Sequence, residues 1–192
     1  MSYRLLRQDC LPDSWSIQVV EGIHIQTLIR GRPLDPPASP IQVSLSALGT
    51  LPSDFLESPC PIVSDRMKRA LERTGLTSLQ WFPAELTSSL TGSVHRRFWA
   101  MNVIGMLTCV DRLSSQAQEV EDSLQLELGP FAIDPLRTYD LSLFRLAEDP
   151  RVIMIHQRVQ NALLAADLRG LLLQDPGAYD NGLPACTASR AN

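Results

Sequence analysis

The chain has 192 residues, of which 44% are hydrophobic, enough to bury one substantial core or two small subdomains. No apolar run approaches the roughly 20 residues that a membrane span needs. The N-terminal residues lack the continuous apolar core of a secretory signal, so we expect a cytoplasmic protein that does not bind membranes. The formal net charge is -4 and the basic residues do not cluster, which argues against nucleic acid as a partner.

The cysteines do not point to a metal site or to a disulfide framework. Cys10, Cys60, Cys109 and Cys186 are far apart in the sequence and form no C-x-x-C pair. Zinc sites and small disulfide-rich domains both need cysteines at closer, paired spacings. We therefore expect free thiols, most of them buried.

In chain order, the first predicted element is a hairpin over residues 15–30. Residues 15–20 and 23–29 each alternate apolar and polar side chains, with a two-residue turn at 21–22. Four prolines between residues 31 and 40 then forbid both a strand ladder and a helix. We expect a stiff, extended connector there.

Strict alternation returns over residues 41–47 and predicts a half-buried strand. The next organised stretch, residues 61–82, recurs in pattern 92 positions later. In each copy an apolar lead-in reaches a polar residue that can open a helix, Ser64 or His156. Gly75 or Asp167 then ends the helix.

The two predicted helices share an apolar face with spacing i, i+3, i+4 and i+7. That face consists of Met67, Ala70, Leu71 and Thr74 in the first helix and of Val159, Ala162, Leu163 and Ala166 in the second. One interpretation is an internal duplication of a strand-helix-strand unit. The other is that two unrelated amphipathic helices align this well by chance.

Between the two helices, residues 78–82 predict a strand that Pro83 stops, and residues 84–93 predict a surface loop rich in serine and threonine. Residues 98–111 are the most apolar run in the chain. They fit a strand buried on both faces, and a short core helix also fits the periodicity. Asn102 interrupts this run and must find partners, since an unpaired buried amide costs about 1–3 kcal/mol.

Two further strands are predicted at residues 124–128 and 141–146. Together these elements indicate an α+β protein with a mainly antiparallel sheet and two principal helices. Residues 1–176 would form a single domain, with residues 41–176 as its core, and residues 177–192 a flexible tail.

The sequence offers no catalytic constellation. The three histidines, His24, His95 and His156, have no metal-ligand spacing, and no nucleophile elbow, phosphate loop or dinucleotide fingerprint is present. We expect no catalytic residues, no metal and no cofactor. A small hydrolase using His95 or His156 is the alternative.

A local cluster of negative charge is the best candidate for binding. Glu119, Glu121, Asp122 and Glu127 lie close together in the sequence. One interpretation is a solvated loop. The other is an acidic face that pairs with a basic groove on a partner protein, and nucleases have such grooves. Arg96 and Arg97 are the second candidate surface.

Four segments resemble a bacterial family, the myxobacterial-type immunity proteins, over about residues 40–175. The segments are PIVSDRMKRALERTGL, LQWFPAEL, FWAMNVIGMLTCVDRLS and LSLFRLAEDPRVIMIHQRVQNALLAADLRGL. The resemblance rests on Ile62 to Arg66, Trp81 to Ala84, Asn102 with Cys109 to Asp111, and Phe144-Arg145. The family pattern often has Ser or Thr where this sequence has His156.

The resemblance implies an immunity protein that binds and neutralises a cognate toxin by stoichiometric protein-protein interaction. A type VI secretion effector is the first partner to consider, and a nuclease is one candidate activity for it. The family supplies no catalytic residues. An adaptor or chaperone that loads the effector for secretion is the alternative, and a homodimer is compatible with either role.

Overall fold

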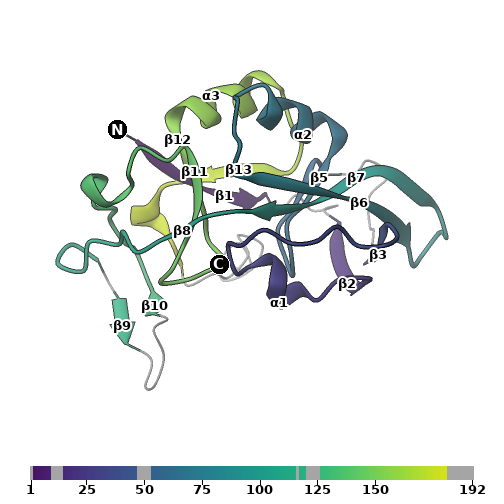
Figure 1. Ribbon diagram of the computed structural model, residues 1–192, viewed down its shortest axis with the longest axis horizontal. Coiled ribbons are helices and arrows are strands. Elements are labelled where there is room, and N and C mark those ends of the chain that lie inside the picture. Colours follow the sequence, from purple (N-terminus) through teal and green to yellow (C-terminus); the bar gives the residue numbers. More distant parts are fainter. Residues whose placement is uncertain (1, 10–14, 47–52, 116, 120–125, 181–192) are drawn as a thin grey trace, which may run out of the picture.

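The computed structural model describes residues 2–9, 15–46, 53–115, 117–119 and 126–180, and these form an α+β fold dominated by strands (Figure 1). This confirms the predicted fold class. Its α-helices are α1 (Ile25–Leu28), α2 (Asp65–Glu72) and α3 (Gln157–Ala165). Two short 3-10 turns are also present: η1 (Pro135–Arg137) lies between the tenth and eleventh strands, and η2 (Pro176–Ala178) follows the last strand.

The larger sheet has six strands. In spatial order they are β2 (Ser16–Glu21), β3 (Ile41–Ser46), β6 (Leu79–Ser88), β7 (Val94–Val103), β5 (Ile62–Ser64) and β4 (Phe55–Leu56). The β3–β6 pair is parallel and the other pairs are antiparallel.

The second sheet has five strands, in the order β13 (Leu171–Gln174), β1 (Tyr3–Gln8), β12 (Ile153–His156), β11 (Leu143–Leu146) and β8 (Met106–Leu107). Here the β11–β8 pair is parallel and the rest are antiparallel. A separate two-stranded arm, β9 (Ala117–Glu119) with β10 (Leu126–Leu128), projects from the body (Figure 1).

The two strand-helix-strand units have the same topology. β5 and β6 flank β7, and β12 and β13 flank β1, with every pair antiparallel. Each helix therefore connects two parallel strands that have one antiparallel strand between them. The repeat seen in the sequence is thus a repeat in the structure, although the central strand follows the first unit and precedes the second in the chain.

The helix boundaries follow the predicted residues. The Ser64 side chain accepts a hydrogen bond from the Met67 N–H at 3.2 Å, and His156 Nδ1 accepts one from the Arg158 N–H at 3.3 Å. These bonds satisfy donors that a helix start leaves unpaired. Gly75 and Asp167 have φ of 74° and 48°, the left-handed conformation that ends many helices.

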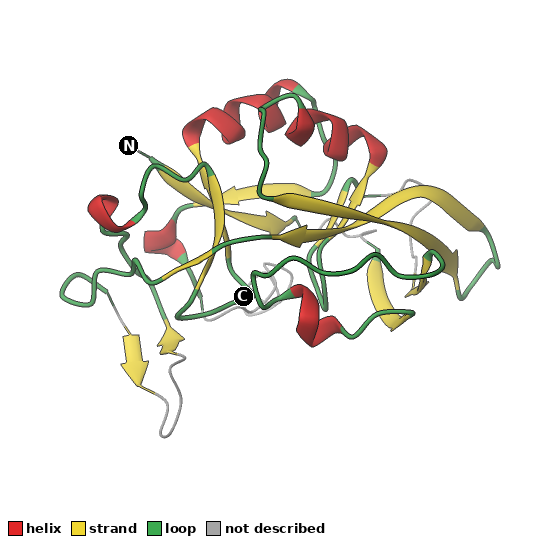
Figure 2. Ribbon diagram, viewed as in Figure 1, coloured by secondary structure: helices red, strands yellow, loops and turns green. Residues whose placement is uncertain are grey.

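α2 and α3 lie side by side on one face of the sheets, with α1 on the opposite side (Figure 2). Their buried faces enter a shared core that includes Met67, Leu71, Val159 and Leu163. Arg66 at the start of α2 donates to the carbonyl oxygens of Ala166 and Asp167 beyond the end of α3, at 3.0 and 2.8 Å. A cation at a helix C-terminus also interacts favourably with the helix dipole.

The predicted hairpin over residues 15–30 is wrong in its second half. β2 forms where expected, but its partner is β3 and not residues 23–29. Those residues contain α1, in which the Thr27 N–H and hydroxyl both donate to the His24 carbonyl oxygen at 2.9 and 2.6 Å. Alternation over so few residues is also compatible with a single helical turn. The strand that pairs with β2 was therefore set by the distant β3 and not by the local pattern.

The strand predicted to stop at Pro83 continues to Ser88, so the loop predicted for residues 84–93 is wrong except for its last part. The β3 ladder begins only at Ala84. β6 is therefore an edge on that side at Pro83, which is where a strand tolerates proline. Beyond it, Ala84 and Leu86 point into the core.

The apolar run over residues 98–111 is a strand at its start, as predicted, but it serves both sheets. β7 ends at Val103, Gly105 has φ of 110°, and β8 then joins the five-stranded sheet. Asn102 Nδ2 donates to the Arg32 carbonyl oxygen at 2.8 Å and to Gln80 Oε1 at 2.9 Å. The buried amide thereby holds the proline-rich connector against the six-stranded sheet.

Sequence patterns missed β1, an interior strand of the five-stranded sheet that pairs with β12 and β13. At the other end of the chain, Tyr179 is 2% exposed, so the folded core extends past residue 176. Residues 181–192 of the predicted tail lie outside the described part of the chain. The predicted strands at 41–47 and 141–146 correspond to β3 and β11, and β10 covers the end of the one at 124–128.

Gly170 offers a test of how closely the two units approach. A Cβ at Gly170 would lie 2.8 Å from the Ser53 side chain, whereas a Cβ at Gly75 would meet nothing within 4 Å. Both have a positive φ, 72° and 74°, so each alanine variant carries a backbone cost of about 1 kcal/mol. We expect Gly170→Ala to reduce the free energy of unfolding by about 2–4 kcal/mol because overpacking adds to that cost. Urea denaturation of both variants measures this, and equal losses would contradict the close approach.

Candidate functional site

The structure separates the two surfaces proposed from the sequence. Arg96 and Arg97 lie on β7, where Arg96 pairs with Glu85 at 3.0 Å and Arg97 with Asp65 at 3.1 Å. Their side chains are 70% and 79% exposed. The β6–β7 hairpin and the β9–β10 arm lie at opposite ends of the molecule in Figure 1, so the arginines do not form one site with Glu119 and Glu127.

Two residues of the acidic cluster, Glu119 and Glu127, lie in the strands of the β9–β10 arm. Glu119 ends β9 and pairs in register with Leu126, while Glu127 in β10 pairs with Gln118. Glu121 and Asp122 lie outside the described residues. The chain segments that precede and follow the arm are paired with each other by an antiparallel bridge between Val110 and Ile133.

Two exposed leucines, Leu113 and Leu136, flank this arm in the chain, and their neighbours Ser114 and Pro135 line one groove. Leu113 is 99% exposed and Leu136 is 88% exposed. Each follows an aspartate turn: the Leu113 N–H donates to Asp111 Oδ1, and the Leu136 N–H donates to Asp134 Oδ1, both at 3.0 Å. Such turns depend only on neighbouring residues in the chain, and they fix the backbone position of each leucine.

The groove that these neighbours line is open and has a volume of about 580 Å³. Its lining includes Ser114 and Ala132 from the arm's base and Arg4 and Asp175 from the ends of β1 and β13. Arg4 and Asp175 form an ion pair there. We call the arm, the two exposed leucines and this groove the arm-base surface.

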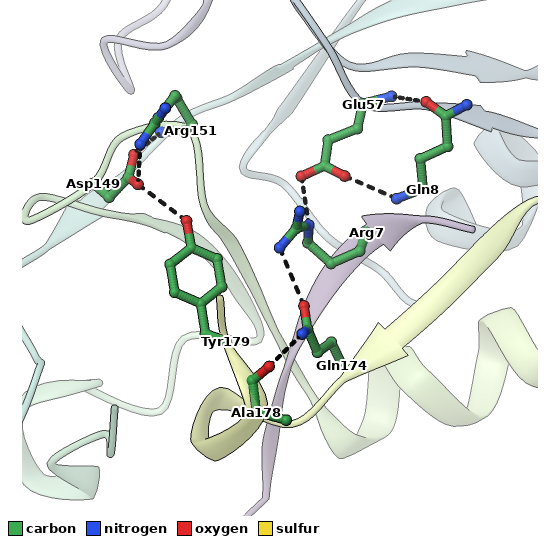
Figure 3. A network of polar contacts seen from close by, with 8 residues as sticks. All are labelled: Arg7, Gln8, Glu57, Asp149, Arg151, Gln174, Ala178 and Tyr179. Carbon is green, nitrogen blue, oxygen red and sulfur yellow. Dashed lines mark hydrogen bonds and ion pairs between the residues drawn. The ribbon is translucent and has the colours of Figure 1, made fainter. Parts of the chain in front are cut away.

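A second, smaller pocket of about 150 Å³ lies elsewhere, where antiparallel pairing brings three strand ends to one edge. Three of its lining residues come from these strand ends: Arg7 near the end of β1, Val152 just before β12, and Arg145 in β11. Arg7 is buried and its Nε pairs with Glu57 at 2.7 Å, while its Nη1 donates to Gln174 Oε1 at 3.1 Å (Figure 3).

A neighbouring part of the same network holds the end of the described chain. The Tyr179 hydroxyl donates to Asp149 Oδ2 at 3.1 Å, and Arg151 donates to both oxygens of that carboxylate at 2.9 and 2.7 Å (Figure 3). Burial raises the pKa of Tyr179, with the Asp149 charge acting in the same direction. The phenol therefore stays protonated and donates at any physiological pH.

The histidines do not converge on a reaction centre. His156 caps α3, and His95 packs against Trp15 with ring centroids 4.8 Å apart. The described part of the chain contains no group of three or more His, Cys, Asp or Glu residues placed to hold a metal. Cys60 and Cys109 are free and buried, and burial raises the pKa of each to about 12, which keeps them as unreactive thiols.

A family model matches residues 35–178, which is well over half of the chain, and its description is Immunity protein family (Imm11). The chain belongs to this immunity family. The match spans β3 to η2 and so includes both strand-helix-strand units, the arm and the two exposed leucines. β1 and β2 precede it, and with β1 the part of the groove that Arg4 lines. No curated protein matches the sequence.

Membership in Imm11 indicates a protein that takes part in neutralising a toxin, and it points to an inhibitory, non-catalytic role. A cognate toxin is accordingly the partner that the family implies. No helix in the described ranges is both long and apolar enough to cross a membrane.

Sequence reasoning missed the two leucines and the Arg145 pocket. A signal for the leucines exists, because Asp-x-Leu follows a buried segment at both Asp111 and Asp134 and predicts an aspartate turn. No comparable signal marks Arg145, since its surroundings come from β1, from the loop after β4 and from the end of the described chain.

Tyr179 allows the network and the packing to be measured separately. Tyr179→Phe removes only the hydrogen bond to Asp149, which keeps Arg151, so we expect a loss of about 1 kcal/mol in unfolding free energy. Tyr179→Ala also empties a site packed against Phe131, whose ring centroid is 5.5 Å away, and should cost about 3–5 kcal/mol. Chemical denaturation measures both. If alanine costs no more than phenylalanine, Tyr179 does not anchor the end of the core.

Proposed function

We propose that this Imm11 protein neutralises a cognate secreted toxin by forming a stoichiometric complex in the cytoplasm, with the arm-base surface as the contact region. The toxin would be a type VI secretion effector, and a nuclease fits the acidic character of the arm. Family membership carries this proposal. The arm-base surface supports it because charge, exposed apolar side chains and a groove occur together there.

The exposed leucines favour a protein partner. Solitary surface leucines are ordinary, but two nearly fully exposed ones on neighbouring fixed turns offer apolar anchors beside a groove. Asp111 and Asp134 belong to segments that hydrogen-bond to each other through the Asp111 N–H and Ala132 oxygen, at 2.9 Å. The two anchors therefore keep a fixed spacing, which reduces the entropy lost on binding.

The acidic residues supply a different part of the interaction. A nuclease must present positive charge to the phosphates of its substrate, so its cleft attracts a negatively charged arm. Complementary charge mainly raises the association rate and orients the encounter, whereas buried apolar anchors slow dissociation. The arm and the leucines are accordingly expected to have separable kinetic effects.

Co-expression with the toxin encoded beside the gene tests the proposed function. We expect growth of a heterologous host to be restored by this protein, and a complex of fixed stoichiometry with an inactive toxin to co-purify. An adaptor that loads the effector for secretion would bind the same partner but leave it active. A purified complex with full toxin activity, or no complex and no protection, would exclude neutralisation by binding.

Substitutions at the arm-base surface test where the toxin binds. Changing Leu113 and Leu136 to aspartate should weaken the complex by about tenfold or more, mainly through faster dissociation. Reversing Glu119, Glu121 and Asp122 to lysine should slow association and reduce its dependence on salt. Surface plasmon resonance at two salt concentrations measures both effects.

Leu164→Asp is the matched control, because Leu164 is 66% exposed on α3, away from the arm. It should leave both rate constants unchanged. Wild-type kinetics in the arm-base variants, together with weaker binding after Arg96→Glu and Arg97→Glu, would place the interface on the β6–β7 end of the molecule.

A further inference from the structure

No carboxylate among the described residues pairs with the buried guanidinium of Arg145. The residue is 1% exposed, and its Nη1 donates to the Pro150 carbonyl oxygen at 2.7 Å. Its Nε and Nη2 are buried and find no acceptor within the described ranges of the chain. Burying a cation without a counter-charge is costly, so buried arginines are normally paired with an acid.

The other charges around the pocket are already paired with one another. Arg7 pairs with Glu57, and Arg151 pairs with Asp149, both at 2.7 Å. Cys60 also neighbours Arg145, but burial raises the pKa of its thiol to about 12, so it carries no charge at neutral pH. Burial lowers the pKa of Arg145 to about 10, which still leaves it protonated. The described residues of this region therefore hold one positive charge in excess.

The two unpaired donors of Arg145 have a definite geometry. Nε and Nη2 lie on one edge of the planar guanidinium and point the same way, which matches the two oxygens of a carboxylate. The pocket that Arg145 lines has a volume of about 150 Å³, room for several water molecules or for one small acidic group. Ile29, Pro59 and Pro61 contribute apolar walls that would cover the stem of such a group.

We propose that this pocket binds a single carboxylate group, held in bidentate fashion by Nε and Nη2 of Arg145. One negative charge balances the excess cation, whereas a phosphate dianion would add a second charge beside Glu57. The site shares no lining residue with the groove of the arm-base surface and does not depend on the proposed function. The carboxylate comes either from a free small acid or from the end of a protein chain.

Thermal unfolding of the full chain, with calorimetry, tests the site in Tris chloride at constant ionic strength. Sodium acetate replaces sodium chloride stepwise, and we expect Tm to rise by roughly 2–6 °C once acetate is well above its Kd. Inorganic phosphate at the same ionic strength should have a smaller effect. An unchanged Tm in acetate, or a rise in phosphate alone, would overturn the proposal.

Arg145→Gln should abolish the acetate-dependent rise. Without acetate its Tm should equal or exceed that of the wild type, because an unpaired buried charge has been removed. Arg137→Gln is the matched control, since Arg137 is 59% exposed and pairs with Asp134 outside the pocket, and it should keep the full rise. A full rise retained in Arg145→Gln would rule the site out.

A second variant and an NMR measurement keep the test decisive if the glutamine variant does not fold. Arg145→Lys keeps the charge but loses the planar fork, so at least half of the rise should disappear. In the wild type, acetate should shift the Arg145 Nε–H signal, and no shift would argue against the bidentate contact. N-acetylglycine, which resembles a chain terminus, distinguishes the sources: tighter binding than acetate indicates a protein carboxylate, and equal or weaker binding a free acid.

Discussion

The contact between α2 and α3 is the constraint on which the rest of the structure depends. Each helix covers its own sheet, and their buried faces meet in one core that includes Met67 and Val159. Polar contacts fix how the units meet: Arg66 caps the end of α3, and Asp54 beside β4 accepts the Arg169 N–H at 2.8 Å. Apolar burial supplies most of the favourable free energy, whereas these directional bonds select one arrangement among those that bury similar area.

What the sequence could predict was what local patterns determine. The spacing of apolar residues in both helices, the opening residues Ser64 and His156, and the closing residues Gly75 and Asp167 all concern segments shorter than twenty residues, and all were recognisable. The same reasoning failed where the partner lies far away in the chain. β2 pairs with β3 across the proline-rich connector, and β1 pairs with strands more than a hundred residues later. An alternating pattern shows that a strand can form, but it does not identify the strand's partner.

The candidate sites show the same division between local and distant determinants. The acidic arm and the turns at Asp111 and Asp134 are local features, so they can be predicted from the sequence. The positions of the exposed leucines follow from those turns. The Arg145 pocket is assembled from β1, the loop after β4, β11 and the end of the described chain. Its character depends on which charges meet there. The charges meet because β12 pairs antiparallel with both β1 and β11 and so brings the ends of these two strands to one edge.

Arg145 and Asn102 show how a buried polar group can serve different ends. Both lie in the interior, and each leaves part of its hydrogen-bonding capacity unused among the described residues. The Asn102 amide nevertheless holds the connector in place through Arg32 and Gln80, so the fold itself accounts for it.

Arg145 bonds to the Pro150 carbonyl oxygen, which a neutral donor could satisfy equally well. Packing alone would favour an apolar side chain at this position, because a buried charge without a partner opposes folding. A full positive charge, maintained beside an uncharged thiol and two acids already paired with other arginines, is therefore better explained by a ligand than by the stability of the protein.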